Sequence, residues 1–289
     1  MRKMSKLIMA LALPAAILAG GNANAYQMIT DWNYENLFGF AGYAPTVGRG
    51  AVVGSIPNPV SNFSLPPASA NPTVGMATKL SWGESATPGQ PALVSSLALS
   101  GNAGIGQSLG TVVTNGPSVL DLTLTHQNYP IYWNALTDAT LVGSLMLQAT
   151  APAAFAGLPV GPVTGVFSIK FKETPNVLGA CAVASAIPCR DIFVVDTANS
   201  SPLEDVFLFS LDGYNYFLDL DISGLTGLDD ATCAAAEMAS GCLGFTTEEN
   251  QTSSLSLSFS IHAVPEPGVL ALLGLGLLGL GFGRIRRRN

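Results

Sequence analysis

The acidic residues late in the chain come closest to a metal-binding pattern. Asp219 and Asp221 open a stretch that partly matches the calcium loop D-x-[DN]-x-[DN]-G, with Asp230 at its twelfth position. Apolar residues alternate with the first two aspartates, and this alternation predicts an exposed strand face instead. We therefore expect a solvated strand edge and no cofactor. Calcium at Asp219 and Asp221, or at Asp229 and Asp230, is the alternative.

The segment from Gly106 to Gly110 reads G-Q-S-L-G and matches the nucleophile elbow of serine hydrolases, with Ser108 as the nucleophile. An elbow needs a strand before it and a helix after it. Here the residues before it are rich in Gly and Asn, and those after it are β-like. A base could come only from His126 or His262, the two histidines of the chain. We expect no catalytic site, and a secreted hydrolase is the least favoured alternative.

His126 and Asn128 form the second candidate site. His126 shares the parity of Leu122 and Leu124 along an alternating run, so its side chain should face inward. The pair could hold a ligand or a metal. We expect instead that the two side chains bridge a strand end to a loop, because buried polar groups need hydrogen-bond partners. His262 falls on the serine-bearing face of its strand and is expected to be solvated.

The N-terminal residues have the three parts of a secretory signal peptide. A basic region precedes an apolar stretch from Leu7 to Ala19, and an A-x-A cleavage site ends at Ala25, before Tyr26. Residues 1–25 are therefore predicted to be removed by signal peptidase. The chain that follows is predicted to be translocated across the inner membrane.

Residues 264–289 form a second targeting segment. Pro265-Glu266-Pro267 precedes the apolar residues 268–283, and both prolines prevent a helix from entering from upstream. We expect residues 268–283 to form a single membrane helix of about 24 Å, shorter than a bilayer core of about 30 Å. Such a span suits a temporary anchor. Residues 284–289 should stay on the cytoplasmic side because of Arg284, Arg286, Arg287 and Arg288.

This segment resembles the PEP-CTERM sorting signal, which consists of a Pro-Glu-Pro motif, a hydrophobic helix and an arginine cluster. The resemblance implies recognition at Pro265, Glu266 and Pro267 by an exosortase, in bacteria that also make exopolysaccharide. It further implies transient anchoring in the inner membrane and a final place at the cell surface or in the extracellular matrix. Only the C-terminal segment would contact the membrane, and only before processing.

A second resemblance lies within the body of the chain. Thr125, His126 and Asn128 look like the signature of the Thr-His-x-Asn subfamily of PEP-CTERM proteins. Residues 171–176 (FKETPN) and 244–248 (GFTTE) look like further blocks of that subfamily. The resemblance implies where the protein is located and which fold it has, but it implies no catalytic reaction.

The body between the targeting segments is strongly acidic. Residues 26–264 contain five basic side chains against eighteen acidic ones, a net charge of about −13. Nucleic acid is therefore excluded as an expected partner, because phosphate contacts need Lys and Arg. The acidic body should be soluble and could take divalent cations.

Four cysteines fall into two local pairs, Cys181 with Cys189 and Cys233 with Cys242. An even number in an exported chain indicates disulfides. Three connectivities are possible, and we favour the two local ones. The spacing is not CxxC and no histidine lies nearby, so a zinc site is not expected.

Alternation of apolar and polar residues dominates residues 26–263 and predicts strands with one buried face. The inward rows should be Leu120, Leu122 and Leu124; Phe167, Ile169 and Phe171; and Leu255, Leu257, Phe259 and Ile261. Asp212-Gly213 predicts a hairpin turn between two further strands. Many short strands separated by turn residues favour an all-β fold, a jelly-roll-like β-sandwich with long loops. One short helix is expected near Ala231–Ala239.

These features predict a non-catalytic, exported β-sandwich protein of the cell surface or of an exopolysaccharide or biofilm matrix. Signal peptidase and exosortase would be its partners during export, and exopolysaccharide could be one afterwards. The alternative from another class is an extracellular carbohydrate-binding module. Its candidate stacking residues are Trp82, Trp133 and Tyr129.

Overall fold

The computed structural model describes residues 26–57, 72–174, 190–266 and 268. The predicted signal peptide through Ala25, the Cys181–Cys189 pair and Pro267 lie outside these residues. The same holds for the predicted membrane helix beyond Gly268 and for Arg284, Arg286, Arg287 and Arg288. Among the helices of the described residues, none has the length and apolar character needed to cross a membrane.

Four strands of fourteen residues each form the long axis of the molecule: β1 (Asp31–Ala44), β10 (Asp138–Ala151), β11 (Pro159–Lys172) and β17 (Thr252–Pro265). The shorter strands are β2 (Val53–Pro57), β3 (Ala77–Trp82), β4 (Glu84–Ser85), β5 (Ser95–Gly101), β6 (Gly104–Ile105), β7 (Gln107–Val113), β8 (Val119–Gln127), β9 (Ile131–Tyr132), β12 (Asp191–Asp196), β13 (Val206–Leu211), β14 (Tyr214–Ser223), β15 (Thr226–Gly227) and β16 (Leu243–Thr247). A short helix, α1 (Asp230–Ala235), and a 3₁₀ turn (Thr197–Asn199) complete the described elements.

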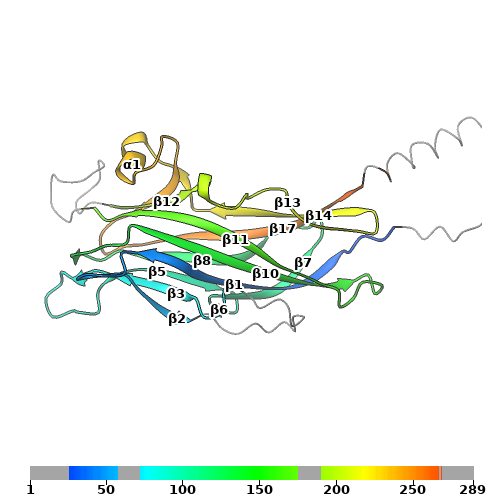
Figure 1. Ribbon diagram of the computed structural model, residues 1–289, viewed down its shortest axis with the longest axis horizontal. Helices are drawn as coiled ribbons and strands as arrows, with labels where there is room; N and C mark the ends of the chain where they lie inside the picture. The colour runs from blue at the N-terminus through cyan, green and yellow to red at the C-terminus, as the bar shows by residue number, and fades with distance from the viewer. Residues whose placement is uncertain (1–25, 58–71, 175–189, 267, 269–289) are drawn as a thin grey trace, which may run out of the picture.

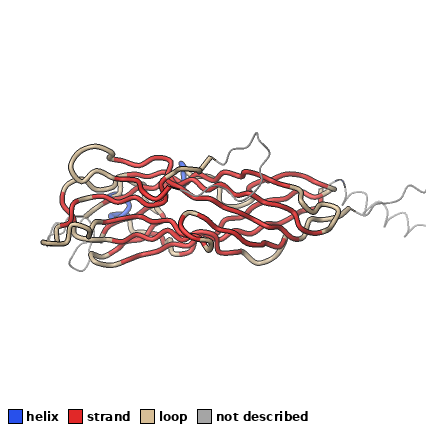
Figure 2. The backbone as a smooth tube through the Cα atoms, turned by 90° about the horizontal axis from the view of Figure 1, so that it is seen from below, coloured by secondary structure: helices blue, strands red, loops and turns tan. Residues whose placement is uncertain are grey.

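One antiparallel sheet folds back on itself to give two layers (Figures 1 and 2). The first layer has the order β13-β14-β17-β8-β5, with β3 and β2 beyond β5, and the second has the order β7-β1-β10-β11-β12-β16-β15. The layers join on one side, where β6 lies between β5 and β7 and where β1 pairs with β3. The predicted all-β sandwich is therefore confirmed: one continuous sheet forms both layers, and β4 and β9 form a separate two-stranded sheet.

The core lies between the layers and is built from the alternating rows. Leu122 and Leu124 of β8 face Leu141 of β10 and Phe167 of β11 within one cluster of buried side chains. A second cluster, toward the end of β17, contains Trp32, Tyr216, Phe259 and Ile261. Burial of each such side chain contributes on the order of 1.5–3 kcal/mol. The rows predicted from β11 and β17 are inward-facing, as expected.

The row predicted on β8 is wrong at its first position. Leu120 is 55% exposed and Asp121 only 1% exposed. The register between β8 and β17 shifts between Leu257 and Ser258, so that Leu122 pairs with the first and Leu120 with the second. A β-bulge of this kind adds one residue and turns it toward the other face. Asp121 is the residue turned inward.

The predicted hairpin at Asp212-Gly213 is confirmed. Both residues have positive φ angles, 47° and 73°, as a two-residue hairpin turn of type I′ requires. The turn joins β13 to β14 at the end of the sandwich toward which β17 runs (Figure 1). Helix α1 is shorter than the predicted Ala231–Ala239 and begins one residue earlier.

Candidate functional site

Strand β17 contains the start of the Pro-Glu-Pro motif. Pro265 is the last residue of the strand and lies opposite Tyr214 of β14. The amide of Glu266 then donates a hydrogen bond to the carbonyl oxygen of Gly213 at 2.8 Å. The motif therefore leaves the body of the protein directly from a paired strand, with no linker between them.

The turn between β13 and β14 contacts both ends of the exported body. The amide of Gln27 donates a hydrogen bond to Oδ2 of Asp212 at 2.5 Å. Tyr26 lies against Gly213, where an added Cβ would come within 2.8 Å of the tyrosine ring. Since Glu266 bonds to the same glycine, the residues next to both predicted cleavage regions meet at one end of the sandwich.

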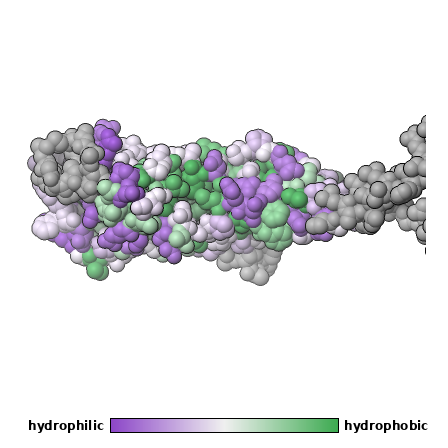
Figure 3. All heavy atoms as spheres, turned by 90° about the horizontal axis from the view of Figure 1, so that it is seen from above, coloured by the Kyte–Doolittle hydropathy of each residue, from purple (hydrophilic) through white to green (hydrophobic). Residues whose placement is uncertain are grey.

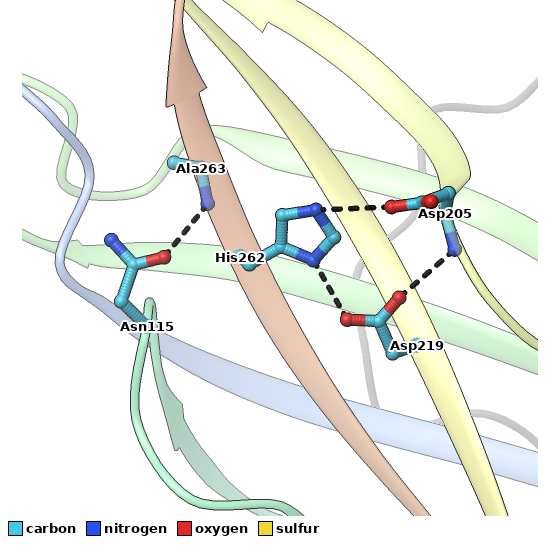
Figure 4. Close-up of polar contacts among 5 residues, drawn as sticks. All are labelled: Asn115, Asp205, Asp219, His262 and Ala263. Atoms are coloured by element: carbon cyan, nitrogen blue, oxygen red, sulfur yellow. Dashed lines mark hydrogen bonds and ion pairs between the residues drawn. The ribbon is translucent and has the colours of Figure 1, made fainter.

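Beside this junction, His262 of β17 lies between two carboxylates (Figure 4). Its Nδ1 is 2.7 Å from Oδ2 of Asp219, and its Nε2 is 3.4 Å from Oδ1 of Asp205. The ring also stacks on Phe217, its partner across the strands, with centroids 5.1 Å apart. The expectation of a freely solvated His262 is wrong, because strand pairing places β14 side chains around it.

His262, Asp205 and Asp219, which we call the His262 group, link the loop before β13 to the strand that leads into the motif. Asp219 also accepts a hydrogen bond from the amide of Asp205 at 2.9 Å. Next to it, the side chain of Asn115 accepts one from the amide of Ala263 at 3.0 Å (Figure 4). The group thus forms a closed set of ion pairs and hydrogen bonds.

The Thr-His-x-Asn motif lies at the other end of β17. His126 and Asn128 are fully buried. Nδ1 of His126 is 2.9 Å from Oγ1 of Thr247, and the amide group of Asn128 donates to the carbonyl oxygen of Thr247 at 3.0 Å. Burial lowers the pKa of His126 to about 3, so the ring is neutral at physiological pH. The two hydrogen bonds bridge the end of β8 to the end of β16, and Nε2 of His126 is buried without a hydrogen-bond partner among the described residues.

The two other sequence blocks that resemble the subfamily meet this motif in space. The ring of His126 stacks on Trp82, with centroids 5.9 Å apart and planes at 9°. Phe171 and Phe245, one from each block, have ring centroids 5.0 and 6.5 Å from it. Thr125 points to the opposite face of β8, where its hydroxyl lies 3.1 Å from that of Ser254. The described residues of the three blocks therefore pack together around His126.

Ser108 does not lie on a nucleophile elbow. It is a fully buried residue of β7, and its hydroxyl donates a hydrogen bond to the backbone carbonyl of Asp121. The side chain of Asp121 accepts a hydrogen bond from Nδ2 of Asn36 at 2.6 Å. Burial raises the pKa of Asp121 to about 7, against the lowering effect of this hydrogen bond.

Asn36 and Asp121 line a cavity of about 160 Å³ between the layers. Its other walls are mostly apolar and come from β10, β11, β14 and β17, with Ser201 and Pro202 from the segment before β13. On the face seen from above, apolar residues gather along the middle of the molecule, between more polar ends (Figure 3).

The four aspartates considered for calcium have separate roles. Asp219 belongs to the His262 group, and Asp221 is an exposed residue of β14. Asp229 caps α1 by accepting from the amide of Thr232 at 2.9 Å, and this hydrogen bond lowers its pKa. Asp230 is the first residue of that helix. Within the described parts of the chain, they do not come together as a set of metal ligands.

Of the two predicted cysteine pairs, Cys233–Cys242 forms a disulfide with a Cα–Cα distance of 5.8 Å. The sequence reasoning missed Asp205, and it missed a group of three carboxylates, Glu173, Asp191 and Glu249. A signal for the second group was present, because Glu173 lies within one subfamily-like block and Glu249 directly follows another.

Asp121→Asn should change how stability depends on pH. Because the folded pKa of about 7 lies above the unfolded value, only the folded form stays protonated between about pH 4 and pH 7. The free energy of unfolding should therefore fall as pH rises through this range, by on the order of 4 kcal/mol at most from this group. Urea unfolding of the wild type and of Asp121→Asn across this pH range measures how the free energy of unfolding of each depends on pH. Equal pH slopes would contradict the assignment.

Asn128→Ala should destabilise the protein by about 1–3 kcal/mol, because it leaves the buried carbonyl of Thr247 without its donor. Thr125→Ala, in the same motif but on the opposite face, should stay within about 0.5 kcal/mol of the wild type. Urea unfolding gives both values. Comparable losses of unfolding free energy in the two variants would show that the buried side chain of Asn128 does not contribute more to stability than the side chain of Thr125.

A comparison with known protein families identifies the C-terminal segment that follows from β17. The family described as "PEP-CTERM protein-sorting motif" matches residues 263–288, which begin at Ala263 near the end of β17 and include the whole Pro-Glu-Pro motif. Curated proteins gave no match. The Thr-His-x-Asn subfamily stays a prediction, since the matched residues do not reach Thr125. The chain therefore carries a PEP-CTERM sorting motif at its C-terminal end, which supports export and sorting by an exosortase.

Proposed function

We propose that this PEP-CTERM protein is a non-catalytic component of the cell surface or of an exopolysaccharide matrix. The observation that carries the proposal is that the residues next to both predicted cleavage regions meet at the Asp212-Gly213 turn. A precursor held in the membrane by either end would stand with this turn toward the bilayer. The opposite end of the sandwich, with His126 and Asn128, would then point away from the cell.

The candidate catalytic residues have structural roles, which supports the non-catalytic proposal. The hydroxyl of Ser108 donates a hydrogen bond to a backbone carbonyl oxygen, and His126 is hydrogen-bonded to Thr247. His262 is held between Asp205 and Asp219. The negative charge of the body also suits a component of a hydrated polymer matrix, because it keeps the released protein soluble.

Glu266→Ala in the producing bacterium should trap the precursor in the membrane fraction at its unprocessed size. The physical reason is that the motif carries a single charge between its two prolines, and the substitution removes it. Fractionation and immunoblotting measure the result. Glu237→Ala, at an exposed acidic residue after α1, is the control and should be released as the wild type is. Normal release of the Glu266 variant would contradict the proposal.

A carbohydrate-binding role is the second candidate, and Trp133 favours it. This side chain is 61% exposed, and the guanidinium of Arg49 lies 4.2 Å from the centre of its ring. Trp82, the other tryptophan considered, is only 1% exposed and cannot stack on a sugar. Tyr129 is half-buried and accepts a hydrogen bond from Gln127 at 2.6 Å.

Retention of the full-length chain on the producer's own immobilised polysaccharide tests this second role. Trp133→Ala should lose retention, because an exposed indole supplies the apolar stacking surface. Phe207→Ala, at an aromatic residue of β13 that is 57% exposed, should keep it. Absence of retention of the wild type, or equal retention of the two variants, would remove the carbohydrate-binding role.

A further inference from the structure

Three carboxylates meet at the end of the sandwich opposite the sorting junction. Glu173 follows β11, Asp191 opens β12, and Glu249 lies in the turn before β17. Strand register accounts for the first pair: Lys172 lies opposite Ile192, so the next opposing residues are Glu173 and Asp191. Oxygen atoms of the three side chains all lie within 4.8 Å of one another.

These carboxylates are buried and short of hydrogen-bond donors. Asp191 is 1% exposed and Glu249 is 4% exposed. Both carboxylate oxygens of Glu249, Oδ2 of Asp191 and Oε1 of Glu173 are buried without a hydrogen-bond partner. A buried anion without a partner is costly, and like charges at this separation repel each other. The group therefore needs a positive charge in its middle.

The described part of the chain supplies no cationic side chain to this group. The nearest arginine in the sequence, Arg190, is bound to Glu248 instead, with 2.5 Å between Nη2 and Oε1. Two donors do reach the outer oxygens: Nε1 of Trp82 lies 3.4 Å from Glu173, and the amide of Thr174 lies 2.9 Å from Asp191. These contacts orient the carboxylates and leave their other oxygens directed at one another.

Burial raises the pKa of Glu173 to about 7 and that of Glu249 to about 8. The charge of Glu249 adds to the first shift and that of Asp191 to the second, whereas a hydrogen bond with Asp191 lowers the pKa of Glu173. The pKa of Asp191 is raised for the same reasons. The group therefore competes for any positive charge that can enter, and protons are one such charge. A divalent cation would offset more of the repulsion than a single proton.

The Thr-His-x-Asn motif explains how Glu249 comes to face inward. Its turn closes with a hydrogen bond from the amide of Gln251 to the carbonyl of Glu248 at 3.1 Å. Asn128 holds both sides of that turn: its side chain bonds to Thr247, and its backbone amide donates to the carbonyl of Gln251 at 3.0 Å. The clamped turn directs Glu249 toward Asp191.

We propose that Glu173, Asp191 and Glu249 bind a calcium ion. The donor set consists of oxygen alone, which suits a hard cation. Calcium–oxygen distances of about 2.3–2.6 Å allow ligand oxygens of one ion to lie up to roughly 5 Å apart, as these do. Calcium also accepts irregular coordination, whereas magnesium demands a near-ideal octahedron. The ion would fasten β11, β12 and the turn before β17 to one another.

The test uses the full-length chain in detergent, stripped with EDTA and titrated with calcium chloride or magnesium chloride. We expect one calcium ion to bind by calorimetry. Saturation at about a hundred times Kd should raise the Tm by roughly 5 °C, since a ligand that binds only the folded state stabilises it. Magnesium should give a smaller shift. No heat and no Tm shift with calcium would overturn the proposal, as would a preference for magnesium.

Glu249→Gln keeps the shape of the side chain and removes its charge. It should abolish the calcium-dependent shift while matching or exceeding the Tm of the wild type in EDTA, because one buried negative charge is gone. The second readout shows that the variant is folded. Asp221→Asn, at an exposed acidic residue of β14, should keep the full calcium response. An unchanged response in the Glu249 variant, or a response lost in the Asp221 variant, would overturn the assignment.

Discussion

Strand β17 lies between β14 and β8 and is hydrogen-bonded to both. Its inward side chains, from Leu255 to Ile261, belong to both large core clusters. Removing β17 from the sheet would expose apolar surface along the whole length of the sandwich, at a free-energy cost of about 25 cal/mol for each Å². Because the same strand ends at Pro265, the body must fold around the segment that leads into the sorting motif. Folding and presentation of the motif are therefore coupled through one element.

The length of β17 also separates two different ends of the molecule. Fourteen residues of extended chain span about 45 Å. At one end, Glu266 and Gln27 bond to the same hairpin turn, and the His262 group holds that turn's strand against β17. At the other end lie the Thr-His-x-Asn motif and the buried carboxylates. The sorting motif and the buried carboxylates thus lie at opposite ends of one long strand.

The buried polar groups follow one physical requirement, that each desolvated charge or dipole needs a partner. Asn128 meets it with the backbone carbonyls of Thr247 and Gln251, and the half-buried His262 lies between two aspartates. Asp121 meets it in part with Asn36 and shifts its pKa for the rest. The carboxylates around Asp191 meet it only in part: Trp82 and Thr174 reach one oxygen each of Glu173 and Asp191, while both oxygens of Glu249 are buried without a partner among the described residues.

By itself, the sequence determined the strands, the hairpin at Asp212-Gly213, the inward position of His126 and the sorting motif. These depend on alternation, on turn residues and on a contiguous motif, all of which are local. Only the tertiary structure decided which distant residues meet. A single bulge turned Asp121 inward, and strand register brought Asp191 beside Glu173 and His262 beside Asp219. A one-residue change of register moves every side chain to the other face, and local patterns do not encode the partner strand.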